Sequence, residues 1–384
     1  MHLSSPASAE HVQLYRTTEH EPLVDDVWDE GRVRDAVAGI VDEAERACDG
    51  CFWPDHPRDE WPAFPPGPTT LYLGSAGMCW ALHTLGTSLD VGVVLERALE
   101  SYREHPDFAP DYGGEPSLWM GESGLLLVAR IVASAAADDE RLAARILQNR
   151  ANPTWELMWG SPGTMLAARV CGLDELWRDS AEPLWQRWDE ETHLWTQDLY
   201  GRTARILGPA HGFAGNVHAL RGFVGDDVLR ERVRVPLEQL AMRDGNRVNW
   251  PPAPEAVTVD QIRVQWCHGA PGIVATIGDL MPLELALAGG ELTWYAGPLA
   301  KGGGLCHGTA GNGYALLRCF ALSGDELWLD RARRFAMHAI AQVERERADV
   351  GRGRFTFFTG DVGVALYARS CLQHDARFPT IDYW

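Results

Sequence analysis

Two short motifs in this chain carry side chains that bind soft metal ions, and the two motifs are almost identical. Residues 266–272 read WCHGAPG, and residues 305–311 read LCHGTAG. The pattern Cys-His-Gly-x-x-Gly therefore occurs twice, 39 residues apart. Either the glycines mark a structural repeat that happens to carry the same side chains twice, or two separate turns assemble one metal site.

The residue types in these motifs favour zinc. Cys thiolates and His imidazoles are typical zinc ligands, and a catalytic zinc site keeps three protein ligands and one open position. Cys267, Cys306 and His307 make up such a set. His268 is ambiguous, because it follows a ligand directly. A closed structural Cys2His2 site that uses His268 or His211 is the alternative that the residue types leave open.

The glycines belong to a pattern that extends over most of the chain. Gly-x-x-Gly recurs in an apolar setting seven times, at intervals of 39 to 57 residues. A fixed unit that returns at such a spacing is typical of repeat architectures. The seven pairs, which define repeats one to seven, are Gly74 and Gly77, Gly121 and Gly124, Gly160 and Gly163, Gly212 and Gly215, Gly269 and Gly272, Gly308 and Gly311, and Gly360 and Gly363.

Each glycine pair opens an apolar run that reads as a helix, for example GLLLVARIVASA at 124–135. Between the pairs lie amphipathic stretches with apolar residues at three- and four-residue steps. One repeat is therefore a helical hairpin with an apolar inner helix, and seven hairpins bury their inner helices by closing into a ring. We predict an all-α fold, an α/α toroid in a single domain over 1–384, with a peripheral segment at 1–30. We also expect the inner helices to present free N–H groups to a shared central cavity.

Composition excludes several classes of protein. Hydrophobic residues make up 46% and charged residues 23% of the chain, which is typical of a globular protein with a large core. The formal charge of −20 argues against a nucleic-acid partner. No apolar run is long enough for a membrane span, and we see no secretory signal at the N-terminus. We therefore expect a cytoplasmic protein, and its eight cysteines to be reduced thiols that are buried or bound to metal.

The motifs PAHGFAGN (209–216), QWCHGAPG (265–272) and KGGGLCHGTAGN (301–312) carry a resemblance. They resemble the zinc-site signatures of the lanthionine synthetase C-like (LanC-like) family, which is built on seven glycine-containing helical hairpins. The family comprises bacterial lanthipeptide cyclases and eukaryotic LanC-like proteins. The cyclases add a peptide cysteine thiol to dehydroalanine or dehydrobutyrine. The eukaryotic proteins are associated with glutathione and its addition to dehydroamino acids.

The resemblance implies roles for individual residues. Cys267, Cys306 and His307 match the family's zinc ligands, and His211 matches its catalytic acid or base. Three further residues match by resemblance. Lys301, five residues before Cys306, matches a eukaryotic lysine near the thiol site, and Arg263 and Trp266, just before Cys267, match an Arg and a Trp of the cyclases.

Two features depart from the cyclases. They keep an Asp a few residues before the first glycine of repeat two, where this chain has Ser117 in a gap-free comparison, and the ending ARFPTIDYW looks more like the eukaryotic type.

The residues suggest a mechanism that matches the resemblance. A free thiol has a pKa of about 8.5 and is mostly protonated at neutral pH, whereas coordination to a metal deprotonates it. The resulting thiolate attacks the β-carbon of a dehydroamino acid. Arg263 or Lys301 stabilises the negative charge that develops, and His211 accepts or returns a proton. We expect a dehydrated peptide or protein as one substrate, and a peptide cysteine or a small thiol such as glutathione as the other.

Three other interpretations compete with this one. A glycoside hydrolase on an α/α barrel needs two opposed carboxylates, and the glycine loops hold few acidic residues. A zinc prenyltransferase uses an Asp-Cys-His set, and no Asp precedes the glycines of repeats four to six. The third is a LanC-like protein that binds zinc and a thiol as a sensor or scaffold without turnover.

Overall fold

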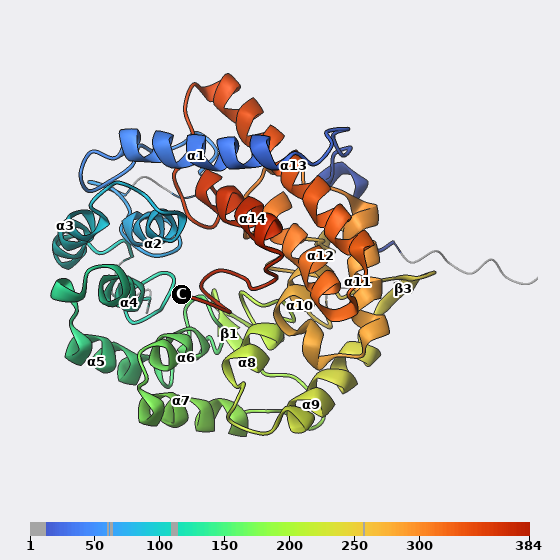
Figure 1. Ribbon diagram of the computed structural model, residues 1–384. Coiled ribbons are helices and arrows are strands. Elements are labelled where there is room, and N and C mark those ends of the chain that lie inside the picture. Colours follow the sequence, from blue (N-terminus) through green and yellow to red (C-terminus); the bar gives the residue numbers. More distant parts are fainter. Residues whose placement is uncertain (1–12, 60, 62–63, 109–113, 256–257) are drawn as a thin grey trace, which may run out of the picture.

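The computed structural model describes residues 13–59, 61, 64–108, 114–255 and 258–384. Within this part of the chain, fourteen α-helices form two concentric layers of seven (Figure 1). The inner layer consists of α2 (Ser75–Leu85), α4 (Glu122–Val132), α6 (Ser161–Val170), α8 (Phe213–Ala219), α10 (Ala270–Ile277), α12 (Thr309–Ser323) and α14 (Asp361–Gln373). The outer layer consists of α1 (Glu30–Ala47), α3 (Val91–Glu104), α5 (Asp139–Asn149), α7 (Asp174–Gln186), α9 (Asp226–Gln239), α11 (Leu283–Ala296) and α13 (Glu326–Val350).

The inner helices pack against their neighbours in chain order, and the last closes on the first. Helix α14 contacts α12 on one side and α2 on the other, while the outer α1 also packs against α14. The chain therefore runs once around the ring, from blue to red in Figure 1. The predicted α/α toroid of seven helical hairpins is confirmed.

Every inner helix begins directly after the first glycine of its pair. Repeat five shows why both glycines are needed. Gly269 has a φ of +99°, and a Cβ on this residue would lie 2.1 Å from the Arg263 carbonyl oxygen. A Cβ on Gly272 would lie 1.6 Å from the Trp266 carbonyl oxygen. The loop that enters the helix thus lies so close to the first turn that no side chain fits between them.

This tight loop also corrects the expectation about free N–H groups at the inner helix ends. The loop curls back so that its own carbonyls accept the first N–H donors of the helix. The Phe213 N–H donates to the Ile206 carbonyl over 2.8 Å, and the Asp361 N–H donates to the Arg354 carbonyl over 2.9 Å. In repeat five the Asn249 side-chain oxygen accepts from the Ala270 N–H. These helix ends are therefore satisfied within the fold.

The middle of the ring is filled by aromatic side chains. The Trp266 ring stacks on Phe378 with centroids 4.4 Å apart, and Trp119 contacts Phe358 at 4.8 Å. Phe378 belongs to the segment after α14, which crosses the ring toward its centre (Figure 1). Farther along this segment, Tyr383 packs on Trp80. A packed aromatic core, which includes Trp266, therefore lies against the loops that bear the Cys-His-Gly motifs.

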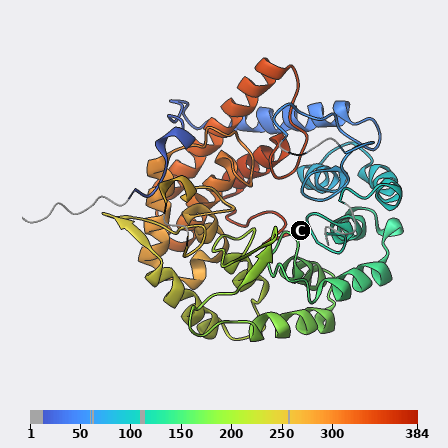
Figure 2. The ribbon, with the colours of Figure 1, turned by 180° about the vertical axis from the view of Figure 1, so that it is seen from behind.

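Strands are as scarce as the sequence predicts. The described residues contain two short antiparallel hairpins, both visible from behind in Figure 2. Strand β1 (Gln197–Leu199) pairs with β2 (Arg202–Ala204), and β3 (Met242–Asp244) pairs with β4 (Arg247–Asn249). Short 3-10 helices complete the elements at Thr17–Glu19, Ser134–Ala136, Val259–Gln261 and Gly278–Leu280. The segment predicted to be peripheral, 1–30, lies outside the described residues over 1–12.

Candidate metal centre

The loops before α10 and α12 bring two sulfur atoms and one imidazole together. The ligand atoms of Cys267, Cys306 and His307 all lie within 4.8 Å of one another. Both cysteines are buried, and His307 is partly exposed. A backbone hydrogen bond of 3.1 Å from the Cys267 N–H to the Cys306 carbonyl joins the two turns directly. The juxtaposition is therefore set by the backbone as well as by the side chains.

The surroundings of Cys267 favour the thiolate that a metal requires. Hydrogen bonds with Cys306 and His307 hold the pKa of the Cys267 thiol well below its usual range despite its burial. The Gln265 side-chain N–H also donates to the Cys267 sulfur over 2.9 Å. Gln265 is itself 7% exposed, so this donor is held in place by packing. A sulfur that accepts several N–H bonds is stabilised in its charged form.

His268 does not join the three ligands. In the described residues the group of mutually close ligand atoms contains Cys267, Cys306 and His307, and neither His268 nor His211 belongs to it. The His268 ring instead stacks on His211, with centroids 5.8 Å apart. Burial lowers the pKa of His268, which keeps its ring neutral near pH 7. This arrangement disfavours the closed Cys2His2 alternative.

His211 lies beside the cluster and is held by a carboxylate from another repeat. Its Nδ1 atom is 3.0 Å from the Glu156 Oε2 atom, and Glu156 is fully buried. The same carboxylate accepts backbone N–H bonds from Met158, Trp159 and Gly160, at 3.0, 2.6 and 3.2 Å. Burial alone would lower the pKa of His211, but the bond to Glu156 and its charge raise it above the usual value.

The other residues expected at the site have different surroundings. Arg263 lies on the loop that leads to Cys267, and its guanidinium donates to the carbonyls of Asp260 and Ile262. It is 3.9 Å from a Glu19 carboxylate oxygen. Trp266 is 0% exposed in the aromatic core. This burial favours a role in supporting the Cys267 loop by packing over a role in contacting a substrate.

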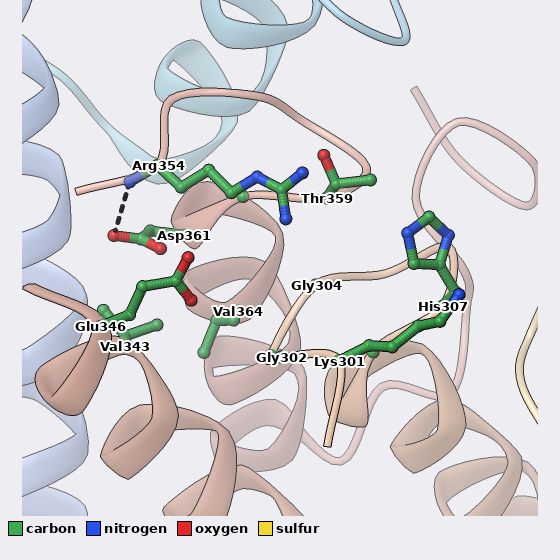
Figure 3. Close-up of a pocket in the computed structure, with 13 residues that line it drawn as sticks. Lys301, Gly302, Gly304, His307, Val343, Glu346, Arg354, Thr359, Asp361 and Val364 are labelled. Atoms are coloured by element: carbon green, nitrogen blue, oxygen red, sulfur yellow. Dashed lines mark hydrogen bonds between the residues drawn. The ribbon is translucent and has the colours of Figure 1, made fainter. Parts of the chain in front are cut away.

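Lys301 lines a small pocket together with His307, where the triple glycine 302–304 turns between them (Figure 3). Its side chain is exposed and extends alongside His307. The volume of this pocket is about 10 Å³, which is close to the space of one water molecule. Arg354, Asp361 and Glu346 form the opposite wall.

Two charged members of that wall are buried. Arg354 is 7% exposed; its Nε donates to a carboxylate oxygen of Asp59 over 2.8 Å. Asp361 is 6% exposed and accepts the Arg354 backbone N–H over 3.3 Å. Burial raises the pKa of Asp361 to about 7.

The sequence did not point to Glu156 or Gln265. Gln265 stands two residues before Cys267, so its position in a motif-bearing loop was a usable signal. Glu156 is 55 residues before its partner His211, and spacing gave no signal for that pair. Ser117, where an Asp was expected by resemblance, is 0% exposed and accepts the Met120 N–H. The carboxylate beside His211 comes from Glu156 in the loop of repeat three.

Comparisons with known proteins agree with this architecture. The chain is 32% identical over 202 residues to a zebrafish (Danio rerio) protein named glutathione S-transferase LANCL1, and 30% identical over 189 residues to the LanC-like protein GCL1 of Arabidopsis thaliana. These matches cover 49% and 46% of this chain, and 47% and 43% of the relatives, so the chain matches about half the length of each.

A solved structure, nisin cyclase, has a similar fold. The TM-score is 0.51 at 15% identity, and the alignment covers 90% of this chain and 98% of the cyclase. Among the described helices, none is both long and apolar enough to cross a bilayer. The model of the family described as lanthionine synthetase C-like protein matches residues 55–383. This chain is therefore a member of the lanthionine synthetase C-like family.

Proposed function

We propose that this protein is a zinc-dependent enzyme that adds a thiol to dehydroalanine or dehydrobutyrine residues of a peptide or protein. The observation that carries the proposal is one juxtaposition. The Cys267, Cys306 and His307 ligand atoms converge within 4.8 Å, and the His211–Glu156 pair lies beside them. A metal site next to a partly buried, oriented imidazole can transfer protons to and from a metal-activated group.

The residues at the site fit zinc. Two sulfurs and one nitrogen are the donor set that this metal prefers, and three protein ligands leave one position open. Gln265 donates a hydrogen bond to the Cys267 sulfur, and such a bond from a residue that is not itself a ligand orients a metal ligand. Zinc bound by these three residues would supply a position at which a substrate thiol loses its proton at neutral pH.

The addition needs one proton to move between two substrates. A bond forms between the thiol sulfur and the β-carbon, the π bond between the α- and β-carbons breaks, and the α-carbon gains a proton, with no leaving group. His211 can take the thiol proton on its Nε2 atom and return it to the α-carbon, because Glu156 fixes the other ring nitrogen. The raised pKa of His211 suits a group that holds a proton between the two steps.

Charge at the site can assist the two substrates separately. In the addition, negative charge spreads onto the acceptor carbonyl, and the Arg263 guanidinium lies on the loop beside Cys267 where it can approach that oxygen. Lys301 extends beside His307 and can pair with an anionic thiol donor. The name of the zebrafish relative supports glutathione as that donor, and the name of nisin cyclase supports a peptide acceptor.

The test combines metal content with product formation. Purified protein is incubated with glutathione and a synthetic peptide that contains one dehydroalanine, and the adduct is followed by mass spectrometry. We expect about one zinc per chain and faster addition than in buffer. Cys306→Ser should lose both, whereas Cys171→Ser, a half-buried cysteine outside the cluster, should keep both. Zinc binding with no addition above the buffer rate would instead assign the protein to the sensor or scaffold class.

A further inference from the structure

The hairpin β1–β2 has an unusual residue at its tip. Leu199 pairs with Arg202, so Tyr200 and Gly201 form a two-residue turn. Their φ angles are +52° and +72°, which is the pattern of a type I′ turn. Asn-Gly and Asp-Gly are the preferred sequences for this turn, because positive φ is tolerated best by Asn, Asp and Gly. A bulky tyrosine at the first turn position is therefore unfavourable for the fold.

Tyr200 is also largely exposed to solvent, where a large ring contributes little to core packing. Its side chain is 58% exposed. The base of the hairpin is fixed, because the fully buried Gln197 accepts the Ile206 N–H over 3.0 Å. A strained and exposed aromatic residue on a fixed base points to a function, since strain of this kind persists mainly at functional sites.

The ring of Tyr200 stands directly beside the candidate acid or base. It meets the His211 ring edge to face, with centroids 6.1 Å apart. The indole N–H of Trp159 donates to the Tyr200 hydroxyl over 3.1 Å, which fixes the ring in this position. Trp159 is itself 3% exposed and packs on Phe108. Tyr200 is thus held by a rigid partner and still presents most of its surface to solvent.

We propose that Tyr200 is an acceptor-binding residue, whose exposed ring holds the backbone of a dehydrated peptide beside His211. This inference rests on the proposed function, and it adds the residue that holds the backbone of the peptide acceptor. Peptide amides next to a dehydroamino acid are planar, and planar groups pack well on an aromatic face. A single dehydroamino acid with capped termini has few atoms beyond its reactive double bond, so it gains little from contact with the Tyr200 ring.

The key variant is Tyr200→Asn, because it removes the ring and places a preferred residue in the turn. We expect unchanged zinc content and a melting temperature close to that of the wild type, because the preferred turn residue offsets the loss of the Tyr200 hydroxyl as acceptor for the Trp159 indole N–H. The KM for a dehydroalanine peptide should rise about tenfold, the scale of one lost aromatic contact, with kcat nearly unchanged. The kinetics with N-acetyldehydroalanine methylamide should stay within about twofold. Tyr200→Phe, which keeps the ring, should retain most of the peptide affinity.

Tyr295→Asn is the matched control, since Tyr295 is also 58% exposed but lies near the end of the outer helix α11. It should leave the KM for the peptide unchanged. Equal peptide KM values for wild type and Tyr200→Asn would overturn the proposal, and so would a lower melting temperature accompanied by equal losses with both acceptors.

Binding separates this proposal from the function on which it rests. Fluorescence anisotropy with a labelled peptide that has alanine in place of dehydroalanine reports affinity without turnover. Weaker binding to Tyr200→Asn than to wild type supports the role of Tyr200 even if no thiol addition is detected. An unchanged Kd excludes that role even if the wild type is an active enzyme.

Discussion

Glu156→Gln tests the pairing that makes His211 a proton carrier. The carboxylate of Glu156 accepts four donors, namely three backbone N–H groups of its own loop and His211. Glutamine has one acceptor oxygen and one NH2 donor. If its oxygen faces the Trp159 and Gly160 N–H groups, its NH2 faces the Met158 N–H and His211. The Met158 N–H also donates to the Ala210 carbonyl and keeps that acceptor, whereas the reversed amide removes the 2.6 Å bond from the Trp159 N–H, so the first arrangement is preferred.

The size of two effects follows from this count. The Met158 N–H keeps the Ala210 carbonyl as an acceptor over 3.2 Å, so the variant loses one of two shared bonds, and the free energy of unfolding should fall by about 0.5–1.5 kcal/mol, the net scale of one hydrogen bond. The glutamine NH2 also requires an acceptor at His211 Nδ1, which moves the ring proton to Nε2. A neutral ring in this tautomer cannot accept a proton at Nε2. Turnover should therefore drop by about 10²–10⁴-fold, the usual contribution of general acid–base catalysis.

The assay compares urea unfolding, zinc content and the rate of thiol addition. Glu122→Gln is the control, because Glu122 is also fully buried in a glycine-loop helix but pairs with Arg141 and Arg145. It should lose stability while keeping turnover by the folded protein. A Glu156→Gln enzyme with wild-type turnover would refute the tautomer reasoning. Loss of zinc in this variant would show that Glu156 acts on the metal site instead.

Three further outcomes are expected. His211→Ala should keep its zinc and lose about 10²–10⁴-fold in turnover, and stoichiometric zinc loss by elemental analysis would make His211 a ligand. Burial raises the pKa of Asp361 from 3.8 to about 7, so the free energy of unfolding of the wild type should fall as the pH rises from about 4 to about 7, by on the order of 4 kcal/mol. Asp361→Asn should match the wild type below about pH 4 and exceed it above about pH 7 in urea unfolding, and parallel curves would contradict this. Phe378→Ala removes the ring stacked on Trp266 and should lower the free energy of unfolding by about 3–5 kcal/mol. Because Cys267 follows Trp266, the variant should also lose zinc to a chelator more readily. An unchanged urea unfolding curve would show that Phe378 does not stabilise the Cys267 loop.

The start of every inner helix was predictable because the signal is local. Where a Cβ would lie 1.6–2.1 Å from a backbone oxygen, as at Gly272 and Gly269, only glycine fits, and this requirement is visible in the sequence itself. The pairing of Cys267 with Cys306 and His307 was within reach for a related reason. Equivalent positions in adjacent repeats of a closed ring are neighbours, so the repeat register places the ligands close together.

The sequence pattern did not predict which way side chains turn toward partners from distant parts of the chain. Repeats three and four were expected to be adjacent, but nothing in the spacing shows that Glu156 turns toward His211. Trp266 was expected at the site because it precedes Cys267. In the structure its ring is buried and stacks on Phe378, which belongs to a segment more than 100 residues away along the chain. Directions of this kind depend on which partners fill the space, and a local pattern does not encode them.

The loops are joined to one another by backbone atoms, which explains how the ring can vary its chemistry. The Met158 N–H donates to the Ala210 carbonyl between repeats three and four, and the Leu305 N–H donates to the Phe358 carbonyl between repeats six and seven. Such bonds need no particular side chain. The glycines and these bonds fix the loop positions, so the residue before each glycine is free to change. Apolar Leu73 can therefore stand where repeat six has His307, and a metal site can occupy part of the ring without altering the rest.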